Sequence, residues 1–306
     1  MANTVNHSSI ESHIKTSHVK RAFSSASGSY DAHAVLQREI ADRLLAHLSF
    51  TKIQPKRILD IGCGTGYFTR LLRGKFKRAE IVAVDLSEAM VQSTRQGHGR
   101  RLPWHGHHHH ISGDAAALPL KAEQFDLVCS NLTMQWLSDP QAMLLEMRRV
   151  LAPGGLMLFS TFGRRTLAEL RQSLASIEPE RAGHVLPFPD VMSLGDALMK
   201  LPIELPVTDT DLFTLTYPDT ISLIRELKGL GASASAIRGR KSGLYGRSLI
   251  KKLECEYSDK HRGEDGKIYA TFEAIYGQAW YKKTGYEHRE GMIPIRAAGD
   301  INLHGV

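Results

Sequence analysis

The sequence predicts an α/β fold with a doubly wound, seven-stranded and mostly parallel sheet. Short apolar segments alternate with helix-forming segments through the first half of the chain, which is typical of parallel strands joined by right-handed crossovers. The clearest unit is residues 57–85, where an apolar strand enters a glycine turn, a helix follows, and a second strand ends at Asp85. We therefore expect one sheet with helices on both of its faces.

Each expected element follows from its own pattern. A helix is predicted over 34–48, because apolar residues recur there at helical spacing just ahead of the first strand. Another is predicted over 220–230, between the last two strand candidates. The expected strands are apolar segments bounded by turn-forming residues: 57–61, 80–84, 109–112, 125–130, 155–160, 212–217 and 267–278.

One domain is predicted over 18–283. Residues 1–17 are polar and are expected to be disordered, and 284–306 form a C-terminal tail. Residues 161–205 follow the fifth strand with a helix-forming stretch and a proline-interrupted segment. Because this segment leaves the sheet at the edge where doubly wound folds bind ligands, we expect a lid over the site. The alternative is an insert that only packs at the periphery.

Composition bounds the class of protein. The chain has 306 residues, a formal net charge of +7 and only three cysteines. No apolar run reaches membrane-spanning length, and the first twenty residues lack a signal-peptide core, so we expect a cytoplasmic protein without disulfides. The basic charge suggests an anionic partner or serves solubility alone.

A histidine-rich segment, residues 105–110, lies between the second helix and the third strand. Its composition suits a metal, but neighbouring loop histidines do not define a tetrahedral set of ligands. No cysteine or carboxylate spacing supports one. We expect no metal site.

The glycine turn indicates a nucleoside ligand. Gly62, Gly64 and Gly66 follow Asp60 as GxGxG, so backbone can approach a ligand closely, and the third glycine of a dinucleotide-binding GxGxxG would fall on Tyr67. Asp85 ends the second strand nineteen residues after the turn, where a carboxylate can accept hydrogen bonds from both ribose hydroxyls. We therefore expect a ligand that contains a nucleoside but is not a dinucleotide.

This turn resembles the first motif of class I S-adenosylmethionine-dependent methyltransferases. Residues 112–119, 124–128 and 148–155 resemble that family's adenine loop, its fourth strand, and the turn into its fifth strand, in the same order. The resemblance implies a Rossmann-like sheet that ends in an antiparallel hairpin, with S-adenosylmethionine as cofactor. The cofactor-binding residues it implies are Asp60, Gly62, Gly64, Gly66, Asp85, Asp114, Ala115, Asn131 and Gln37.

A narrower resemblance covers residues 19 to about 283. The segments VKRAFSSASGSYDAHAVLQ, SNLTMQW, FSTFGRRTLAELR, PVTDTDLFTLTY and TFEAIYGQAW are similar to the malonyl-[acyl-carrier protein] O-methyltransferases of biotin synthesis. One departure is Gly163-Arg164-Arg165, where members of that family commonly have Gly-Pro. The resemblance implies an N-terminal helix ahead of the sheet and methyl transfer to the free carboxylate of a malonyl thioester.

The same resemblance implies the residues around the acceptor. Arg171 is expected to hold the carboxylate in its guanidinium fork, with Tyr30 and His184 as companions and with Gln135 and Trp136 as a pocket wall. The implied partner is malonyl-acyl carrier protein or malonyl-coenzyme A, with no nucleic acid, no membrane and a monomeric enzyme. Two alternatives remain: methylation of another small carboxylic acid, and a methyltransferase-like binding protein without turnover.

Overall fold

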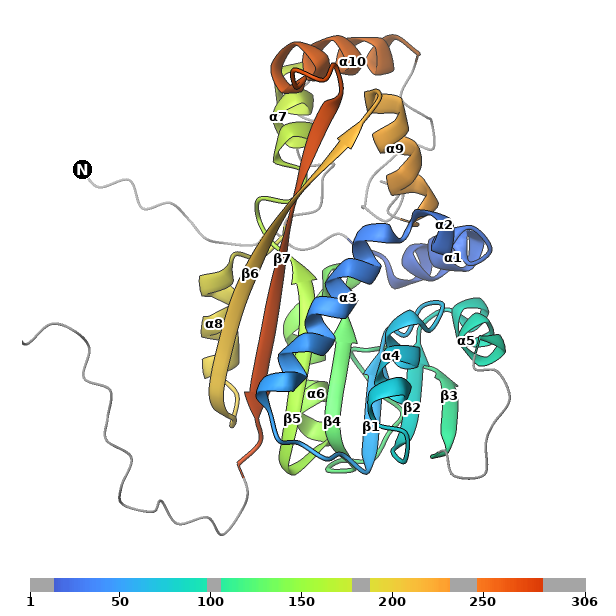
Figure 1. The fold of residues 1–306 in the computed structure, drawn as a ribbon, viewed down its shortest axis with the longest axis vertical. Helices are drawn as coiled ribbons and strands as arrows, with labels where there is room; N and C mark the ends of the chain where they lie inside the picture. Colours follow the sequence, from blue (N-terminus) through green and yellow to red (C-terminus); the bar gives the residue numbers. More distant parts are fainter. Residues whose placement is uncertain (1–13, 98–105, 178–187, 232–246, 283–306) are drawn as a thin grey trace, which may run out of the picture.

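The computed structural model describes residues 14–97, 106–177, 188–231 and 247–282. It contains one seven-stranded sheet in the order β3-β2-β1-β4-β5-β7-β6 (Figure 1). β1 to β5 are parallel, and β7 pairs antiparallel with both β5 and β6. The strands are β1 (Arg57–Ile61), β2 (Glu80–Asp85), β3 (His108–Ser112), β4 (Phe125–Asn131), β5 (Leu151–Phe162), β6 (Glu204–Tyr217) and β7 (Ile268–Trp280). The predicted fold class is confirmed.

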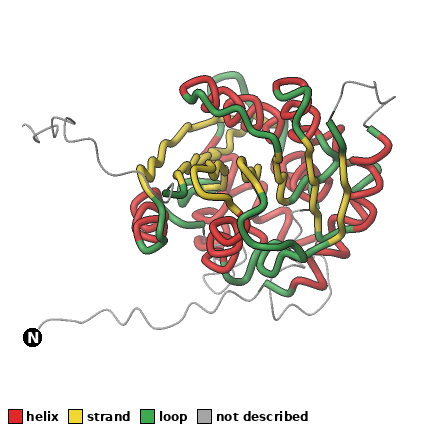
Figure 2. The backbone as a smooth tube through the Cα atoms, turned by 90° about the horizontal axis from the view of Figure 1, so that it is seen from below, coloured by secondary structure: helices red, strands yellow, loops and turns green. Residues whose placement is uncertain are grey.

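Helices cover both faces of this sheet, as the view from below shows (Figure 2). Strand side chains alternate between two buried clusters, with Ile58 and Ile81 in one and Leu59 and Val82 in the other. The helices are α1 (Thr16–Ala26), α2 (Tyr30–His33), α3 (Val35–His47), α4 (Tyr67–Lys75), α5 (Glu88–Gln96), α6 (Pro140–Val150), α7 (Ala168–Ile177), α8 (Val191–Met199), α9 (Thr220–Gly229) and α10 (Arg247–His261). Two short 3-10 turns complete the set, η1 (Leu48–Phe50) and η2 (Met134–Trp136). None of the helices described here has both the length and the apolar character needed to cross a membrane.

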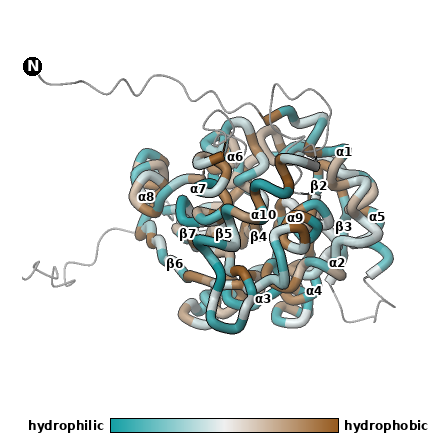
Figure 3. Tube along the Cα trace, turned by 90° about the horizontal axis from the view of Figure 1, so that it is seen from above, coloured by the Kyte–Doolittle hydropathy of each residue, from teal (hydrophilic) through white to brown (hydrophobic). Residues whose placement is uncertain are grey.

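The strand order reverses between β1 and β4. β2 and β3 continue the sheet on one side of this pair, and β5 continues it on the other. The carboxyl ends of β1 and β4 therefore border the point where open α/β sheets bind their ligands. Long β6 and β7 extend beyond this edge toward α7 and α10 (Figure 1), and α9 lies next to α2 in two views (Figures 1 and 3).

Two strands differ from their predicted bounds. β6 begins at Glu204 rather than at residue 212, because a segment of alternating threonine and aspartate pairs with β7 along a solvent-facing edge. β3 begins at His108 rather than at residue 109, so His108 joins His109 and His110 in the strand. β3 is an edge strand that pairs only with β2, and this position tolerates polar side chains.

The segment 161–205 divides between two places. α7 packs against α10 and β7, whereas α8 packs on β6 with Leu194 and Leu198 buried in the core. The lid over the site stays a prediction, since the described part of this segment covers sheet and hairpin. At the other end of the chain, α1 begins at Thr16, ahead of the domain boundary expected at residue 18.

Candidate functional site

The turn after β1 has a backbone that only glycine adopts without strain. Gly62, Gly64 and Gly66 have φ angles of 73°, 55° and 84°, all in the left-handed region. A Cβ on Gly62 would lie 1.9 Å from Oγ1 of Thr133, whereas a Cβ on Gly64 would meet nothing within 4 Å. The turn is fixed to β2, because the N–H groups of Gly62 and Cys63 donate to the carbonyl of Val84 at 2.7 and 3.0 Å.

A cavity opens above this turn, at the carboxyl ends of β1, β2 and β4. It encloses about 860 Å³ of space, including the open solvent at its mouth. Its wall combines glycine backbone and carboxylates with aromatic and aliphatic side chains. The residues that line it are Thr16, Val19, Phe23, Tyr30, Ile61, Gly62, Gly64, Val84, Asp85, Leu86, Met90, Gly113, Asp114, Ala115, Ala116, Asn131, Leu132, Thr133, Trp136, Leu137 and Ser138.

Asp85 is the carboxylate held most firmly in this wall. Its Oδ2 accepts from the N–H of Gly64 at 3.0 Å, and its Oδ1 accepts from the N–H of Ser87 at 2.8 Å. Burial raises the pKa of Asp85, and the two backbone donors oppose that rise. Each oxygen keeps acceptor capacity, so the carboxylate can receive hydroxyl donors from a ligand.

The N-terminal helices close one side of the cavity. The ring of Phe23 meets that of Trp136 edge-on at 5.2 Å between centroids, and Oγ of Ser24 lies 2.9 Å from Oγ of Ser87. Burial and the charges of Asp85 and Asp31 raise the pKa of Tyr30. Its hydroxyl therefore stays protonated and can donate a hydrogen bond inside the cavity.

Asp60 lies beneath the glycine turn rather than in the cavity wall. Only 1 % of its surface is exposed; its Oδ2 accepts from Oγ1 of Thr69 at 2.5 Å, and its Oδ1 has no partner among the described residues. Burial raises the pKa of Asp60 from 3.8 to about 7, with a smaller contribution from the charge of Asp85 and an opposing one from Thr69. This carboxyl is therefore protonated over a pH range in which ordinary aspartates are ionised.

Asp60→Asn is expected to change how stability depends on pH. The folded protein holds the Asp60 proton up to a pH of about 7 and the unfolded chain releases it near 3.8, so the free energy of unfolding falls between these values as pH rises. The neutral amide does not titrate, so the variant lacks this contribution. Urea unfolding of both proteins at several pH values measures the difference, and identical pH dependence would contradict the assignment.

Six of the nine expected cofactor residues line the cavity: Gly62, Gly64, Asp85, Asp114, Ala115 and Asn131. Gly66 and Asp60 support the turn from outside the cavity wall. Gln37 is also absent from the lining, but its backbone carbonyl accepts from Nδ2 of Asn131 at 3.2 Å. Gln37 thus contacts a cavity residue through its backbone, and its contact with the cofactor stays a prediction.

The expected acceptor residues take different positions. Tyr30 and Trp136 line the cavity, whereas buried Gln135 points into the protein, where its Nε2 donates to the carbonyl of Leu132 at 2.8 Å. Arg171 does not line the cavity; its Nη2 donates to the carbonyls of Arg164 and Thr166 at 3.1 and 2.7 Å. Burial lowers the pKa of Arg171, helped by the charge of Arg164. His184 lies outside the described residues.

Several lining residues were not predicted individually from the sequence. Phe23 and Val19 lie on α1, whose segment was expected ahead of the sheet without assigned contacts. Thr133 packs against Gly62, and its neighbour Leu132 has a φ of 52°. The sequence offered one signal for these residues, the aromatic Phe23 close in sequence to Tyr30. The left-handed backbone of Leu132 could not be predicted, because leucine has no preference for that conformation.

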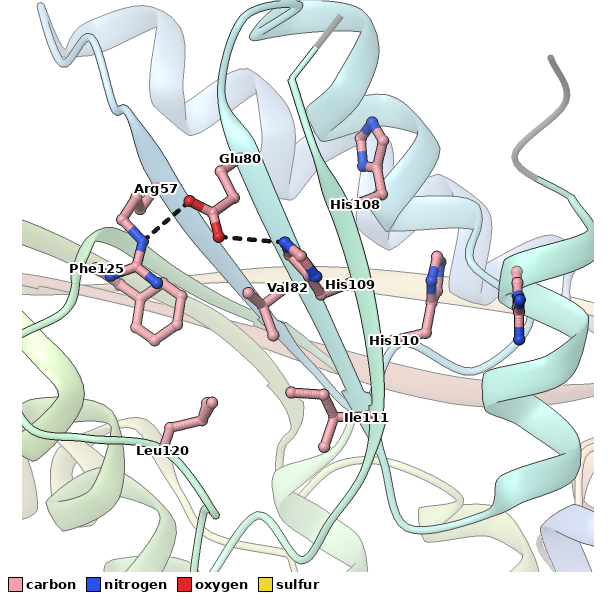
Figure 4. Close-up of a pocket in the computed structure, with 10 residues that line it drawn as sticks. Arg57, Glu80, Val82, His108, His109, His110, Ile111, Leu120 and Phe125 are labelled. Carbon is pink, nitrogen blue, oxygen red and sulfur yellow. Dashed lines mark ion pairs between the residues drawn. The ribbon is translucent and has the colours of Figure 1, made fainter. Parts of the chain in front are cut away.

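A second hollow lies on the sheet face at β2 and β3, away from the glycine turn (Figure 4). Glu80 lies between Arg57 and His109, with Oε2 3.2 Å from Nε of Arg57 and Oε1 3.3 Å from Nε2 of His109. Over the part of the chain that the structure describes, no group of three or more histidine, cysteine or acidic residues is arranged to hold a metal ion. The histidines of β3 therefore line a polar hollow without a metal-binding arrangement there.

Comparison with known proteins places this geometry in a family. The sequence profile described as "Methyltransferase domain" matches residues 59–159. The YcgJ protein of Bacillus subtilis superposes with a TM-score of 0.55 at 16% identity, covering 80% of this chain and 100% of that one, which supports the fold.

Curated relatives match over nearly the whole chain. Malonyl-[acyl-carrier protein] O-methyltransferase of Halorhodospira halophila is 42% identical over 292 residues, covering 94% of each protein. The protein of the same name from Methylovorus sp. is 37% identical over 285 residues, covering 92% of this chain and 95% of its own. Identity at this level over both full lengths means that the chain belongs to the malonyl-[acyl-carrier protein] O-methyltransferase family.

Proposed function

We propose that this protein transfers the methyl group of S-adenosylmethionine to the free carboxylate of a malonyl thioester on an acyl carrier protein. The product would be the malonyl methyl ester that primes pimeloyl formation in biotin synthesis. The observation that carries the proposal is the cavity wall, which joins the Gly62–Gly64 turn and Asp85 to the aromatic residues Phe23, Tyr30 and Trp136. The relatives that bear this activity in their names match 94% and 92% of the chain.

The residues present fit S-adenosylmethionine. Gly62 and Gly64 carry no side chain over the cavity, and the space above Gly64 is open, so the methionine part can approach the backbone of the turn closely. Asp85 would accept the ribose hydroxyls, and Asp114 with Ala115 would border the adenine. The bound sulfonium supplies an activated methyl group, and every other contribution comes from the chain.

The acceptor needs positioning more than proton transfer. A carboxylate with a reference pKa of about 4 is already ionised at neutral pH, so no general base is required. Transfer joins a cation and an anion with loss of both charges, so a site that excludes water favours the transition state over the solvated reactants. Phe23, Trp136 and Leu137 would exclude water, and the protonated Tyr30 would donate to the carboxylate.

We retain Arg171 and His184 as proposed acceptor contacts. Nη2 of Arg171 is engaged with the carbonyls of Arg164 and Thr166, and its buried Nε, which has no partner among the described residues, would donate to the malonyl carboxylate. Its lowered pKa reflects poor hydration, which favours pairing with an anion. We also propose that the enzyme acts as a cytoplasmic monomer on malonyl-acyl carrier protein or malonyl-coenzyme A, without nucleic acid or membrane. The net charge of +7 suits an acidic carrier.

The test is methyl transfer from labelled S-adenosylmethionine to malonyl-acyl carrier protein. Parallel reactions contain malonyl-coenzyme A, acetyl-acyl carrier protein, free malonate and total RNA. We expect label only on the malonyl thioesters, as an ester released by mild base. The acetyl carrier protein is the matched control, because it lacks only the free carboxylate.

Other outcomes would replace the proposal. Label on free malonate alone would favour a methyltransferase for small carboxylic acids. Cofactor binding without label on any acceptor would favour a binding protein without turnover. Label on RNA would contradict the carboxylate chemistry altogether.

A further inference from the structure

The turn that follows β4 is held in an unusual backbone conformation. Leu132 has a φ of 52°, a region that leucine rarely adopts, and it lines the cavity between Asn131 and Thr133. A residue keeps such a conformation only where its surroundings fix it, and such residues concentrate at functional sites. The contacts that fix Leu132 therefore bear on function.

Ser160 of β5 provides the central contact. Parallel pairing of β4 and β5 places Ser160 directly beside Asn131, and Ser160 is fully buried. The N–H of Leu132 donates to both the carbonyl and Oγ of Ser160, each at 3.1 Å. The carbonyl of Leu132 accepts from Nε2 of Gln135 at 2.8 Å, so both backbone groups of the strained residue are occupied.

The hydroxyl of Ser160 also fixes the amide of Asn131. Its Oγ donates to Oδ1 of Asn131 at 2.7 Å, while Nδ2 of Asn131 donates to the carbonyl of Gln37 at 3.2 Å. A backbone carbonyl can only accept, so the amide nitrogen must be the atom that faces Gln37. Turning the amide over would set Oδ1 against the carbonyl of Gln37 and lose that bond, and one N–H of Nδ2 remains for a ligand.

Asn131 was expected among the cofactor-binding residues, but its position at the end of β4 favours the acceptor as the ligand of this N–H. The expected cofactor contacts Gly62, Asp85 and Asp114 follow β1, β2 and β3, which lie on one side of the point where the strand order reverses. Asn131 ends β4, on the other side. The free N–H of Asn131 is therefore available to an acceptor that enters from the β4 side of the cavity. Trp136 lines the same cavity.

We infer that Ser160 is a positioning residue, which holds Asn131 so that its free amide N–H donates to one oxygen of the acceptor carboxylate. This inference rests on the proposed function. The other carboxylate oxygen then attacks: its lone pair forms the new O–CH3 bond, and the electron pair of the broken C–S bond returns to sulfur. A cation and an anion become a neutral thioether and a neutral ester, and no proton moves.

Ser160→Ala is expected to lower kcat for methyl transfer to malonyl-acyl carrier protein by about 10- to 100-fold, since a hydrogen bond to a charged group is lost or misaligned. The dissociation constant for S-adenosylmethionine should change by less than about threefold, because the cofactor side of the cavity is intact. Thr166→Val is the matched control. Oγ1 of Thr166 is equally buried and makes the same two kinds of bond, to the carbonyl and from the N–H of Glu273, at 3.2 and 3.0 Å.

A double-mutant cycle separates positioning from general stability. If Ser160 acts through Asn131, Ser160→Ala should lower kcat no further once Asn131→Ala is present. If the two losses in kcat multiply in the double variant, the inference is overturned, because Ser160 would then act independently of Asn131. If Ser160→Ala does not fold, Ser160→Cys keeps the volume with a weak donor and should give an intermediate kcat.

The wild-type protein keeps the two proposals distinguishable. Wild-type turnover on the malonyl carrier together with an unchanged kcat for Ser160→Ala would overturn the role of Ser160 alone. No wild-type turnover despite measurable cofactor binding would overturn the proposed function and, with it, this inference. A kcat loss equal to that of Thr166→Val would also contradict positioning.

Discussion

Asp85→Asn is expected to abolish useful binding of S-adenosylmethionine. The carboxylate would lose its charge at the point where we propose that it accepts two ribose hydroxyls, and hydrogen bonds to a charged group contribute about 1.5 to 3 kcal/mol each. The amide also presents an N–H₂ group to one of the backbone donors, the N–H of Gly64 or Ser87. We expect the dissociation constant to rise at least about 100-fold, measured by isothermal titration calorimetry.

Asp126→Asn is the matched control for this substitution. Oδ2 of Asp126 likewise accepts two backbone N–H groups, from Lys56 and Arg57 at 2.8 and 2.9 Å, but it lies near the amino end of β4 and lines no part of the cavity. An amide oxygen at position 126 can still accept both N–H groups, so Asp126→Asn should lose no more stability than Asp85→Asn, on the order of 1 kcal/mol. Only Asp85→Asn should lose the cofactor, and equal affinities in the two variants would remove Asp85 from the ribose site.

Gly64→Ala should show the second large effect. Alanine at a φ of 55° costs about 1 to 2 kcal/mol, and its methyl group would enter open space beside the glycine turn. Filling space that a ligand occupies costs about 1 to 3 kcal/mol, so we expect cofactor affinity to fall about 10- to 100-fold with a modest loss of stability.

Gly266→Ala is the matched control, because it introduces the same backbone strain without filling space in the cavity. Gly266 has a φ of 75°, and a Cβ there would also meet nothing within 4 Å, but it lies in the turn before β7, outside the cavity lining. The two variants should have similar midpoints of thermal unfolding without ligand. If Gly266→Ala weakened cofactor binding as much as Gly64→Ala, the effect would be global rather than local.

The unit from β1 to β2 could be predicted closely from sequence. Its apolar strands, its glycine turn and the acid at its end are successive in the chain, so neighbouring residues define the geometry. The second half of 161–205 was harder, because the apolar stripe of α8 is compatible with a lid and with a core helix. In the structure, α8 packs on β6 with Leu194 and Leu198 buried, and the lid stays a prediction.

Arg171 shows the same limit at the level of one side chain. Its place on α7 was correctly predicted to be helical, but a sequence does not say which acceptors a guanidinium meets. In the structure, one nitrogen of the guanidinium, Nη2, donates to the carbonyls of Arg164 and Thr166, whereas the buried Nε has no partner among the described residues. A local turn at the start of α7 thus competes with any ligand for this cation.

The sequence by itself determined the order of strands and helices, the left-handed glycines and the place of Asp85, because these depend on local backbone preferences and hydrophobic periodicity. Only the tertiary structure decided how Gln37, Asn131 and Ser160 meet. These residues come from α3, β4 and β5, and strand register with side-chain direction brings them together. Such contacts depend on packing between distant segments, which no local pattern encodes.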